Sequence, residues 1–169
     1  MNSNKSCLGK WLWVIAWLCT SPAAWALKSD ADQPVYIDSN AATYDDSKAI
    51  SIYTGDVVAT QGTLEVRGDR LEVYFKQGKI DKIIAKGKPA RFQQQPDNGG
   101  LITGKALTGE YYPERSLLIL IDQAVVNQDG NVYESDLIRY DSKNEIVKAG
   151  EQSSGNKRVR VILQPKNKN

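Results

Sequence analysis

Histidine is absent from the 169-residue sequence, and cysteine is scarce, with Cys7 and Cys19 as the only two. Both cysteines, all four tryptophans and the only methionine fall within residues 1–26. The rest of the chain therefore has no imidazole base, no thiolate nucleophile and none of the common ligands of transition-metal sites. These absences exclude a Ser-His-Asp triad, and we expect no cofactor and no metal ion.

Carboxylate pairs are the remaining route to hydrolytic chemistry, and the obvious candidate is Asp45-Asp46. This pair directly follows Tyr44 in a polar turn, where aspartate is favoured because its side chain accepts hydrogen bonds from nearby backbone amides. Residues 97–100, Asp-Asn-Gly-Gly, indicate a flexible turn rather than a phosphate-binding loop, because no helix pattern follows them. With no catalytic motif, the chain is not expected to be an enzyme.

Residues 1–26 have the pattern of an export signal that is cleaved off. A basic start precedes the apolar stretch 11–19, and Ala24-Trp25-Ala26 forms a cleavage site after which the mature chain would begin. One alternative is a lipoprotein processed at Cys19, which the bulky residues before that cysteine disfavour. The other is a retained membrane anchor, although the stretch is shorter than the roughly 20 apolar residues that span hydrocarbon.

The balance of charge narrows the possible partners. The full sequence has 22 basic and 20 acidic residues, and removing Lys5 and Lys10 with the signal leaves 20 of each sign. A chain without a basic excess lacks the electrostatic attraction on which nonspecific nucleic-acid binding depends. We therefore expect no nucleic-acid partner.

A repeated rhythm runs through the chain after the signal. Each cycle has a tyrosine followed by a polar turn, and the four tyrosines are Tyr44, Tyr74, Tyr112 and Tyr140. A small or acidic residue follows later in each cycle, at Gly55, Gly87, Asp122 or Gly150. Units this short cannot bury their own apolar faces, so the rhythm predicts stacked units that share one core. Two pairs of equivalent residues, Gln61 with Gln128 and Asp69 with Asp136, indicate duplicated strand pairs.

Apolar and polar residues alternate with period two in many short runs, and no window of helical length has a period of three to four. Glycine-containing turns separate the runs, which is typical of an all-antiparallel β sandwich, roll or barrel. The alternation predicts one apolar interior lined by Val35, Ile37, Ile50, Ile52, Leu64, Val66, Leu71, Val73, Ile84, Leu118, Leu120 and Ile138. From the residues alone, this interior is either an open groove or an ordinary closed core.

Four segments together resemble a known family. They are Asp32–Ser39, Gly55–Leu64, Gly68-Asp69-Arg70-Leu71 and Gly87-Lys88-Pro89-Ala90. These segments are similar to the periplasmic lipopolysaccharide-transport proteins of the LptA family, in the OstA-like superfamily. The resemblance covers essentially all of residues 32–163, with its second half matching by rhythm more than by identity, and it implies a β-jellyroll domain over residues 27–163. Residues 164–169, polar and lysine-rich, are expected to form a disordered tail.

The resemblance implies both a fold and a role. The fold is an all-β, V-shaped, twisted antiparallel β-jellyroll whose two sheets enclose an apolar groove. The role is non-enzymatic: such a protein carries lipopolysaccharide across the periplasm, between an anchored transport protein of the inner membrane and a translocon of the outer membrane. Two other hypotheses about the function stay open. The chain could be a membrane-anchored inner-membrane homologue with the same fold, or an exported glycan-binding β module.

Acyl chains would bind to apolar side chains inside the groove, without any polar motif. The resemblance assigns lipid contacts to Val35 and Ile37 on the first strand, to Phe92 and to Tyr112. Together with the alternation, it predicts the lipid-binding set Val35, Ile37, Ile52, Leu64, Val66, Leu71, Val73, Phe92, Tyr112, Leu118 and Leu120. The phosphorylated sugar head would meet basic side chains at the groove edge, and the candidates are Lys76, Lys79, Lys82 and Lys86. The alternative is that this basic run is a solvated face.

The first strand, 35–38, and the last, 158–163, have no partner beyond them in the sequence. Unpaired strand edges recruit further strands. If one end of a molecule pairs with the opposite end of a second copy, the contact does not close and generates a filament. The sequence therefore predicts head-to-tail self-association through edge strands.

Overall fold

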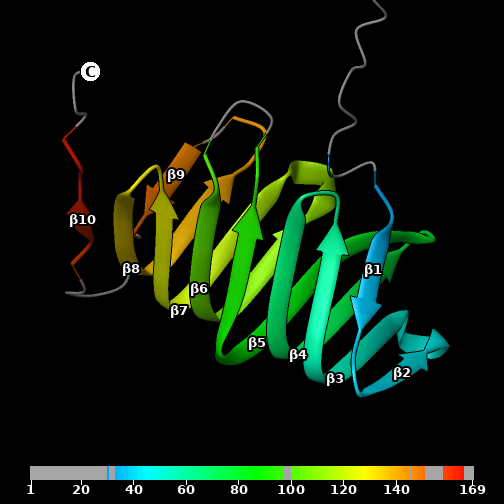
Figure 1. The fold of residues 1–169 in the computed structure, drawn as a ribbon. Coiled ribbons are helices and arrows are strands. Elements are labelled where there is room, and N and C mark those ends of the chain that lie inside the picture. The colour runs from blue at the N-terminus through cyan, green and yellow to red at the C-terminus, as the bar shows by residue number, and fades with distance from the viewer. Residues whose placement is uncertain (1–29, 31–32, 97–99, 145, 151–157, 166–169) are drawn as a thin grey trace, which may run out of the picture.

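The computed structural model describes residues 30, 33–96, 100–144, 146–150 and 158–165 (Figure 1). Ten strands account for most of these residues: β1 Val35–Asp38, β2 Ala41–Asp45, β3 Ile50–Gln61, β4 Leu64–Lys76, β5 Lys79–Gln94, β6 Ile102–Tyr112, β7 Leu117–Gln128, β8 Asn131–Asp141, β9 Ile146–Ala149 and β10 Arg160–Ile162. Two single-turn 3-10 helices, η2 (Asp46–Lys48) and η3 (Pro113–Arg115), connect β2 to β3 and β6 to β7. The predicted signal peptide lies outside the described residues.

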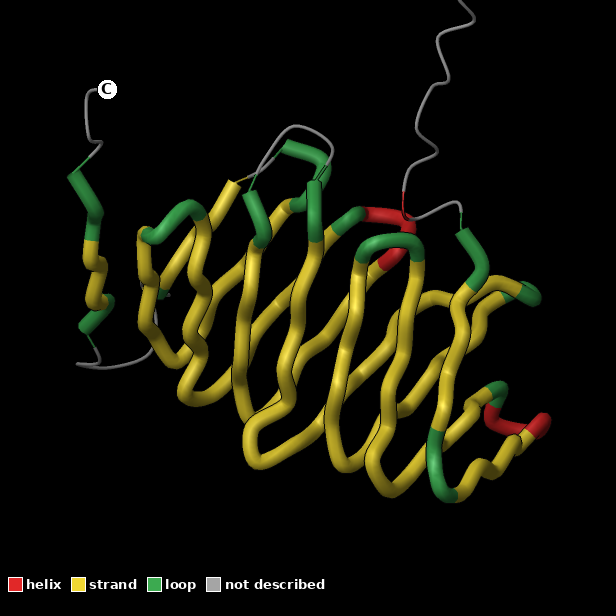
Figure 2. The backbone as a smooth tube through the Cα atoms, in the orientation of Figure 1, coloured by secondary structure: helices red, strands yellow, loops and turns green. Residues whose placement is uncertain are grey.

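The strands form one antiparallel sheet in the order β1-β3-β4-β5-β6-β7-β8-β10, with β2 also paired to β3 and β9 to β8. Each long strand bends near its middle, so the sheet folds over into two layers (Figures 1 and 2). Layer A, in front, holds 57–61, 64–68, 90–94, 102–106, 124–128 and 131–135, with β1 and β10 at its edges. Layer B, behind, holds 50–54, 70–74, 83–86, 108–112, 117–121 and 137–141, with β2 and β9 at its edges.

This arrangement confirms the predicted antiparallel jellyroll, but the two expected sheets are two layers of a single sheet. The bends coincide with irregularities in the strand register, for example between Thr54 and Val57 in β3 and between Ile121 and Ala124 in β7. At both places two consecutive residues have positive φ: Gly55 (80°) and Asp56 (42°) in β3, Asp122 (62°) and Gln123 (53°) in β7. Bulges of this kind bend a strand and sharpen its twist. The duplication read from the sequence thus corresponds to two equivalent bends.

Small side chains line the inside of the bends. Ala90 and Ala106 face each other across β5 and β6 and are both 0% exposed, and Ala124 occupies the equivalent place on β7. Gly68 adjoins them, and a Cβ at this position would lie 2.7 Å from the carbonyl oxygen of Lys86. The two layers can converge at the bends because these positions carry almost no side chain.

Larger apolar side chains fill the interior farther from the bends. Residues directly opposite each other on neighbouring strands share a face, so the register identifies inward-facing rows. Two rows on layer B are Ser51, Val73, Ile83, Tyr111, Leu118, Tyr140 and Tyr53, Leu71, Ala85, Gly109, Leu120, Ile138. One row on layer A is Ile37, Ala59, Val66, Phe92, Gly104, Val126 and Tyr133. The buried members of these rows form one contiguous core.

Three residues predicted for the interior lie on the opposite face. Ile52 is opposite Glu72 on β4, and Ile84 is opposite both Glu72 and Glu110, on the outer face of layer B. Ile50 shares this face because it is two residues from Ile52 on the same strand. The prediction was wrong because period-two alternation does not say which set faces inward, and pairing with the fully buried Val73 turns Ser51 inward instead.

The carboxylate pair belongs to the turn that η2 makes. Asp45 is the N-cap residue and accepts hydrogen bonds from the Lys48 backbone N–H (3.2 Å) and the Ser47 hydroxyl (2.6 Å). The Lys48 ammonium lies 2.6 Å from the second oxygen, and its hydrogen bond, with that of Ser47, lowers the pKa of Asp45 to about 2. Asp46 accepts a hydrogen bond from Tyr44 (2.9 Å). The prediction that the pair lies in a turn is confirmed, and Asp45 accepts the predicted hydrogen bond from a nearby backbone amide.

Candidate functional site

The space between the two layers is the candidate site, because apolar side chains from both layers point into it. Of the predicted lipid-binding set, nine residues lie on this inner side: Val35, Ile37, Leu64, Val66, Leu71, Val73, Phe92, Leu118 and Leu120. Val35 and Ile37, on the edge strand β1, are partly buried, whereas the other seven are fully buried. The inner faces thus form a continuous apolar surface that reaches the N-terminal edge of the fold.

The interior is largely filled by its own side chains. Leu71 is 1% exposed and Leu120 0%. A small cavity of about 20 Å³ lies between the layers, lined on layer A by Leu64 and Ile102 among others and on layer B by Leu118, Leu120 and Tyr140. In this conformation the two layers are closed on each other, so a bulky guest can enter only if they separate.

Phe92 joins the two layers most directly. It extends from β5 in layer A, and its ring atoms lie where any side chain on Gly109 of layer B would have to be. Gly109 lies opposite both Ala85 and Leu120 on the inner face and is buried. The sequence placed Phe92 in the site but gave no reason to single out Gly109, because an isolated glycine in a strand does not reveal what approaches it.

Tyrosine placement corrects a second prediction. Tyr112 lies on the outer face, where its hydroxyl donates to the Glu110 carboxylate (2.8 Å) and the Arg115 guanidinium lies 5.6 Å from its ring centroid. Tyr111 faces inward instead, opposite Ile83 and Leu118, and is 8% exposed. Burial, together with the charge of Asp30, raises the pKa of Tyr111 to about 12. The structure thus places Tyr112 outside the predicted groove interior, and its neighbour Tyr111 occupies the inner position.

The turns that follow the tyrosines explain why the predicted position differs by one residue from the inward-facing one. Tyr44 precedes the N-cap residue of η2, Asp45, by one position, and Tyr112 is itself the N-cap residue of η3. The residue of β6 equivalent to Tyr44 is therefore Tyr111. Tyr140 completes the inward series, because it lies opposite Leu118 and is 3% exposed. Tyr111 and Tyr112 are adjacent, so a match to the family that is displaced by one residue assigns the contact to the opposite face of the strand.

The basic candidates do not gather inside the groove. Lys82 lies over the ring of Tyr74, 4.7 Å from its centroid, and the Lys86 ammonium is 3.5 Å from the Glu72 carboxylate, both on the outer face of layer B. Whether these two lysines contact phosphate stays a prediction. Lys76 and Lys79 pair with each other across the β4–β5 turn, at the tip of layer B.

Glu72 is the centre of a polar cluster on the outer face. It is 8% exposed and accepts hydrogen bonds from Arg70 Nε (2.8 Å) and the Tyr74 hydroxyl (2.9 Å). Burial alone would raise the pKa of Glu72, but the hydrogen bonds and the positive charges of Lys86 and Arg70 outweigh it and lower the pKa. The cluster holds Lys86 in a structural role.

Asp30 connects the start of the described chain to the tip of layer A, a contact that no sequence pattern predicted. Its carboxylate accepts hydrogen bonds from the Thr63 backbone N–H (2.8 Å), the Thr63 hydroxyl (2.6 Å) and the Gln94 amide (2.8 Å). Gln33, which follows closely, accepts a hydrogen bond on its carbonyl from the Gln61 side chain (3.1 Å). These bonds anchor the segment that leads into β1.

Open strand edges occur at both ends of the fold. Of the described strands, β1 and β2 pair with β3 alone, and β9 and β10 pair with β8 alone. Exposed apolar side chains accompany the C-terminal edge, for example Val161 (45%) and Leu163 (68%). The prediction that the first and last strands end the sheet is confirmed. Gln164 donates its backbone N–H to Asn131 Oδ1 (3.0 Å), and residues 166–169 of the predicted tail lie outside the described chain.

Within the part of the chain that the structure describes, no group of three or more Cys, Asp or Glu side chains is arranged to hold a metal ion. No helix among the same residues is long and apolar enough to cross a membrane.

The sequence of the chain is similar to those of known lipopolysaccharide transport proteins. Residues 36–146 match the family described as LptA/(LptD N-terminal domain) LPS transport protein. The chain is 36% identical over 155 residues to the lipopolysaccharide export system protein LptH of Pseudomonas aeruginosa, covering 88% of this chain and 89% of that protein. It is 33% identical over 150 residues to the lipopolysaccharide export system protein LptA of Escherichia coli K12, covering 88% and 80%.

A solved structure agrees with the sequence matches. The crystal structure of LptH, the LptA-homologous periplasmic component of the lipopolysaccharide transport device of P. aeruginosa, superposes with a TM-score of 0.76. The sequence identity in this comparison is 32%, and the match covers 82% of this chain and 100% of that one. The likeness therefore extends over both layers of the fold.

Proposed function

The chain belongs to the family of LptA and LptD N-terminal-domain lipopolysaccharide transport proteins, and from this premise we propose that it carries lipopolysaccharide through the periplasm by holding the acyl chains between its two layers. The observation that carries the proposal is the continuous apolar surface on the inner faces of both layers. The protein makes and breaks no covalent bond in this role.

Hydrophobic transfer supplies the binding free energy. Each methylene group moved from water into the groove contributes roughly 0.8 kcal/mol, so several acyl chains together bind firmly without any directional polar contact. The buried positions of Leu71 and Leu120 require the layers to part before the chains can enter. Apolar acyl groups then replace the contacts that the two layers make with each other, which keeps the cost of opening low.

The proposed contacts are the inward-facing members of the predicted set, with Tyr111 added. They are Val35, Ile37, Leu64, Val66, Leu71, Val73, Phe92, Leu118, Leu120 and Tyr111. Val35 and Ile37 are the most accessible of these, because β1 is an edge strand. Lys76 and Lys79, at the tip of layer B, are proposed to meet phosphates where the groove opens.

Export and assembly complete the proposal. Residues 1–26 are removed after Ala26 during export to the periplasm, which an intact mass corresponding to residues 27–169 of the exported protein would support. The open edges at the two ends of the fold are proposed to pair head-to-tail with further copies and, at the ends of the row, with an anchored transport protein of the inner membrane and a translocon of the outer membrane.

The decisive experiment is the lipid content of protein purified from the periplasm. We expect lipopolysaccharide to copurify with the unaltered protein and to be reduced at least tenfold in Ile37→Asp, because a carboxylate on the inner face of β1 opposes acyl binding. Ile119→Asp is the matched control, since Ile119 lies on the outer face opposite Glu110 and Arg139. Equal lipid content in all three proteins would refute the groove as the binding site.

A further inference from the structure

Three cations stand side by side on the outer face of layer A. Arg67 on β4 is directly opposite Arg91 on β5, and Arg91 is directly opposite Lys105 on β6. The chain neighbours Val66 and Phe92 belong to the inner row, so the cationic side chains project outward, and all three are exposed. Directly opposed like charges weaken strand pairing, so this row is unfavourable unless an anion lies against it.

Nearby carboxylates balance only part of this charge. Glu65 Oε1 lies 2.6 Å from Arg67 Nε, and this hydrogen bond raises the pKa of Arg67. Farther along the face, Glu134 lies 3.8 Å from an Arg160 guanidinium nitrogen. Among the described residues, no acidic side chain forms an ion pair with Arg91 or Lys105. These two cations on neighbouring strands are therefore a local excess of positive charge.

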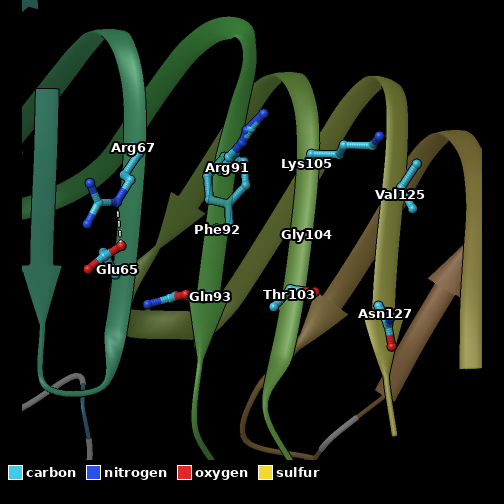
Figure 3. A pocket seen from close by; sticks show the side chains of 10 residues that line it. All are labelled: Glu65, Arg67, Arg91, Phe92, Gln93, Thr103, Gly104, Lys105, Val125 and Asn127. Carbon is cyan, nitrogen blue, oxygen red and sulfur yellow. Dashed lines mark hydrogen bonds and ion pairs between the residues drawn. The ribbon is translucent and has the colours of Figure 1, made fainter. Parts of the chain in front are cut away.

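A hollow of about 420 Å³ lies over the same three strands and reaches β7 (Figure 3). The three cations line it together with neutral polar side chains of the adjacent row, Gln93, Thr103 and Asn127. Figure 3 shows Lys105 extended toward Val125, with Thr103 and Asn127 nearer the ends of their strands. Guanidinium and ammonium groups suit phosphate oxygens, and carboxamides and hydroxyls suit the hydroxyls of a sugar.

A second hollow of about 480 Å³ adjoins the first and shares Lys105 and Val125 with it. This hollow adds Arg158 and Arg160, from the C-terminal segment that carries β10, together with the carboxylates of Glu134 and Asp136 on β8. The two hollows run across the strands from β4 toward β10, which is longer than a single phosphate ion requires. The shape fits an extended ligand whose anionic groups lie at the Arg91 and Lys105 end, because the carboxylates balance the arginines at the other end.

We propose that the outer face of layer A binds a phosphorylated saccharide, with Arg91 and Lys105 contacting phosphate and Gln93, Thr103 and Asn127 contacting sugar hydroxyls. This identification rests on the proposed function, in which the ligand is the sugar part of a lipopolysaccharide whose acyl chains occupy the groove. Gln94 and Ile102 lie at the tip of layer A, three residues from Arg91 and Lys105, or about 10 Å along the strands. A saccharide that leaves the groove at this tip can fold over it and reach the cations.

The test uses the mature protein and lipopolysaccharide saccharide from which all acyl chains have been removed but the phosphates kept, titrated by calorimetry. We expect Arg91→Gln/Lys105→Gln to weaken binding at least tenfold and to reduce its dependence on salt, because charged hydrogen bonds to phosphate are lost. Arg115→Gln/Lys148→Gln, which removes the same charges from exposed positions on η3 and β9, should change affinity less than twofold. Unchanged melting temperatures establish that both variants fold.

Three results would overturn the proposal: no binding of the phosphorylated saccharide to the unaltered protein, equal losses in the two double variants, or equal binding of inorganic phosphate or phosphatidylglycerol vesicles. Binding that persists after enzymatic removal of the phosphates would also overturn it. The lipid content of periplasmic Arg91→Gln/Lys105→Gln separates this proposal from the groove. If the acyl-bearing lipid still copurifies while the saccharide does not bind, the outer site fails and the groove stands.

Discussion

The ring of Phe92 on layer A lies against the backbone of Gly109 on layer B, so closely that any side chain at position 109 would overlap it. Phe92 is 5% exposed, and Gly109 belongs to the inner row that includes Leu71, Ala85 and Leu120. This contact joins the two layers close to the bends, because Phe92 is two residues from Ala90 and Gly109 is three residues from Ala106.

Gly109→Ala should therefore destabilise the protein by steric overlap with Phe92. We expect the free energy of unfolding in urea to fall by about 1–3 kcal/mol, the usual cost of an overpacked interior. Phe92→Ala alone should cost about 3–5 kcal/mol, because it leaves a cavity between the layers.

The double variant Phe92→Ala/Gly109→Ala distinguishes overlap from a general loss of glycine flexibility. If the ring is what a side chain at 109 meets, the alanine at 109 costs little once Phe92 is gone, and the two effects are strongly non-additive. Additive free energies would show that Phe92 and Gly109 are not in contact.

Tyr111 makes stability depend on pH in the alkaline range. Its pKa is raised to about 12 by burial, above the value near 10 of an unfolded tyrosine, so the folded state favours the neutral hydroxyl. The resulting stability is fully present below pH 10 and is lost as pH rises through 12. A shift of this size corresponds to about 3 kcal/mol at most.

Tyr111→Phe should remove this dependence. Urea unfolding at pH 8 and pH 11 should show a smaller loss for Tyr111→Phe than for the unaltered protein, and the difference between them isolates the one hydroxyl. Tyr36→Phe, at a position 65% exposed, is the control and should follow the unaltered protein. Parallel pH profiles for all three proteins would contradict a buried, neutral Tyr111.

Asp30 should stabilise the tip of layer A. Asp30→Ala removes the acceptor for the Thr63 backbone N–H and hydroxyl and for the Gln94 amide, and we expect a loss of about 1–3 kcal/mol. Hydrogen exchange at the Thr63 amide should accelerate, whereas exchange at Val66, within the core of β4, should not change. Asp38→Asn, an exposed carboxylate on β1, controls for loss of charge. Unchanged protection of Thr63 in Asp30→Ala would argue against the anchor.

Sequence patterns predicted the strand class and most of the interior, and the residues assigned to the wrong face share one cause. Four leucine and valine residues were assigned correctly to the interior, namely Leu71, Val73, Leu118 and Leu120. The strand register places the residues that alternate with them on the outer face. The assignment of Ile52 to the interior was wrong because the alternation of Ile and Ser allows either residue type to face inward. Only the pairing of β3 with β4 decides which of them does. The face of a strand is a property of its neighbours, which one segment of sequence does not contain.

Small residues were missed for a different reason. Ala90, Ala106 and Gly109 carry no apolar signal large enough to stand out, although they permit the two layers to approach. Their role depends on what lies opposite them in the folded chain. The cationic row on layer A was also invisible in the sequence, because its three members come from three separate strands.

Self-association should depend on the C-terminal edge. β10 pairs with β8 alone among the described strands, and Val161, Ile162 and Leu163 are exposed beside its free edge. We expect the mass measured by light scattering to increase with concentration for the mature protein, and this increase to be lost when residues 158–163 are deleted, because the deletion removes the strand edge that would recruit β1 of a second copy. Truncation after Leu163 keeps the edge and removes only the polar tail, so it should assemble normally. A mature protein that stays monomeric at every concentration, or a deletion variant that assembles as well as the truncated control, would show that the two open ends of the fold do not pair with each other.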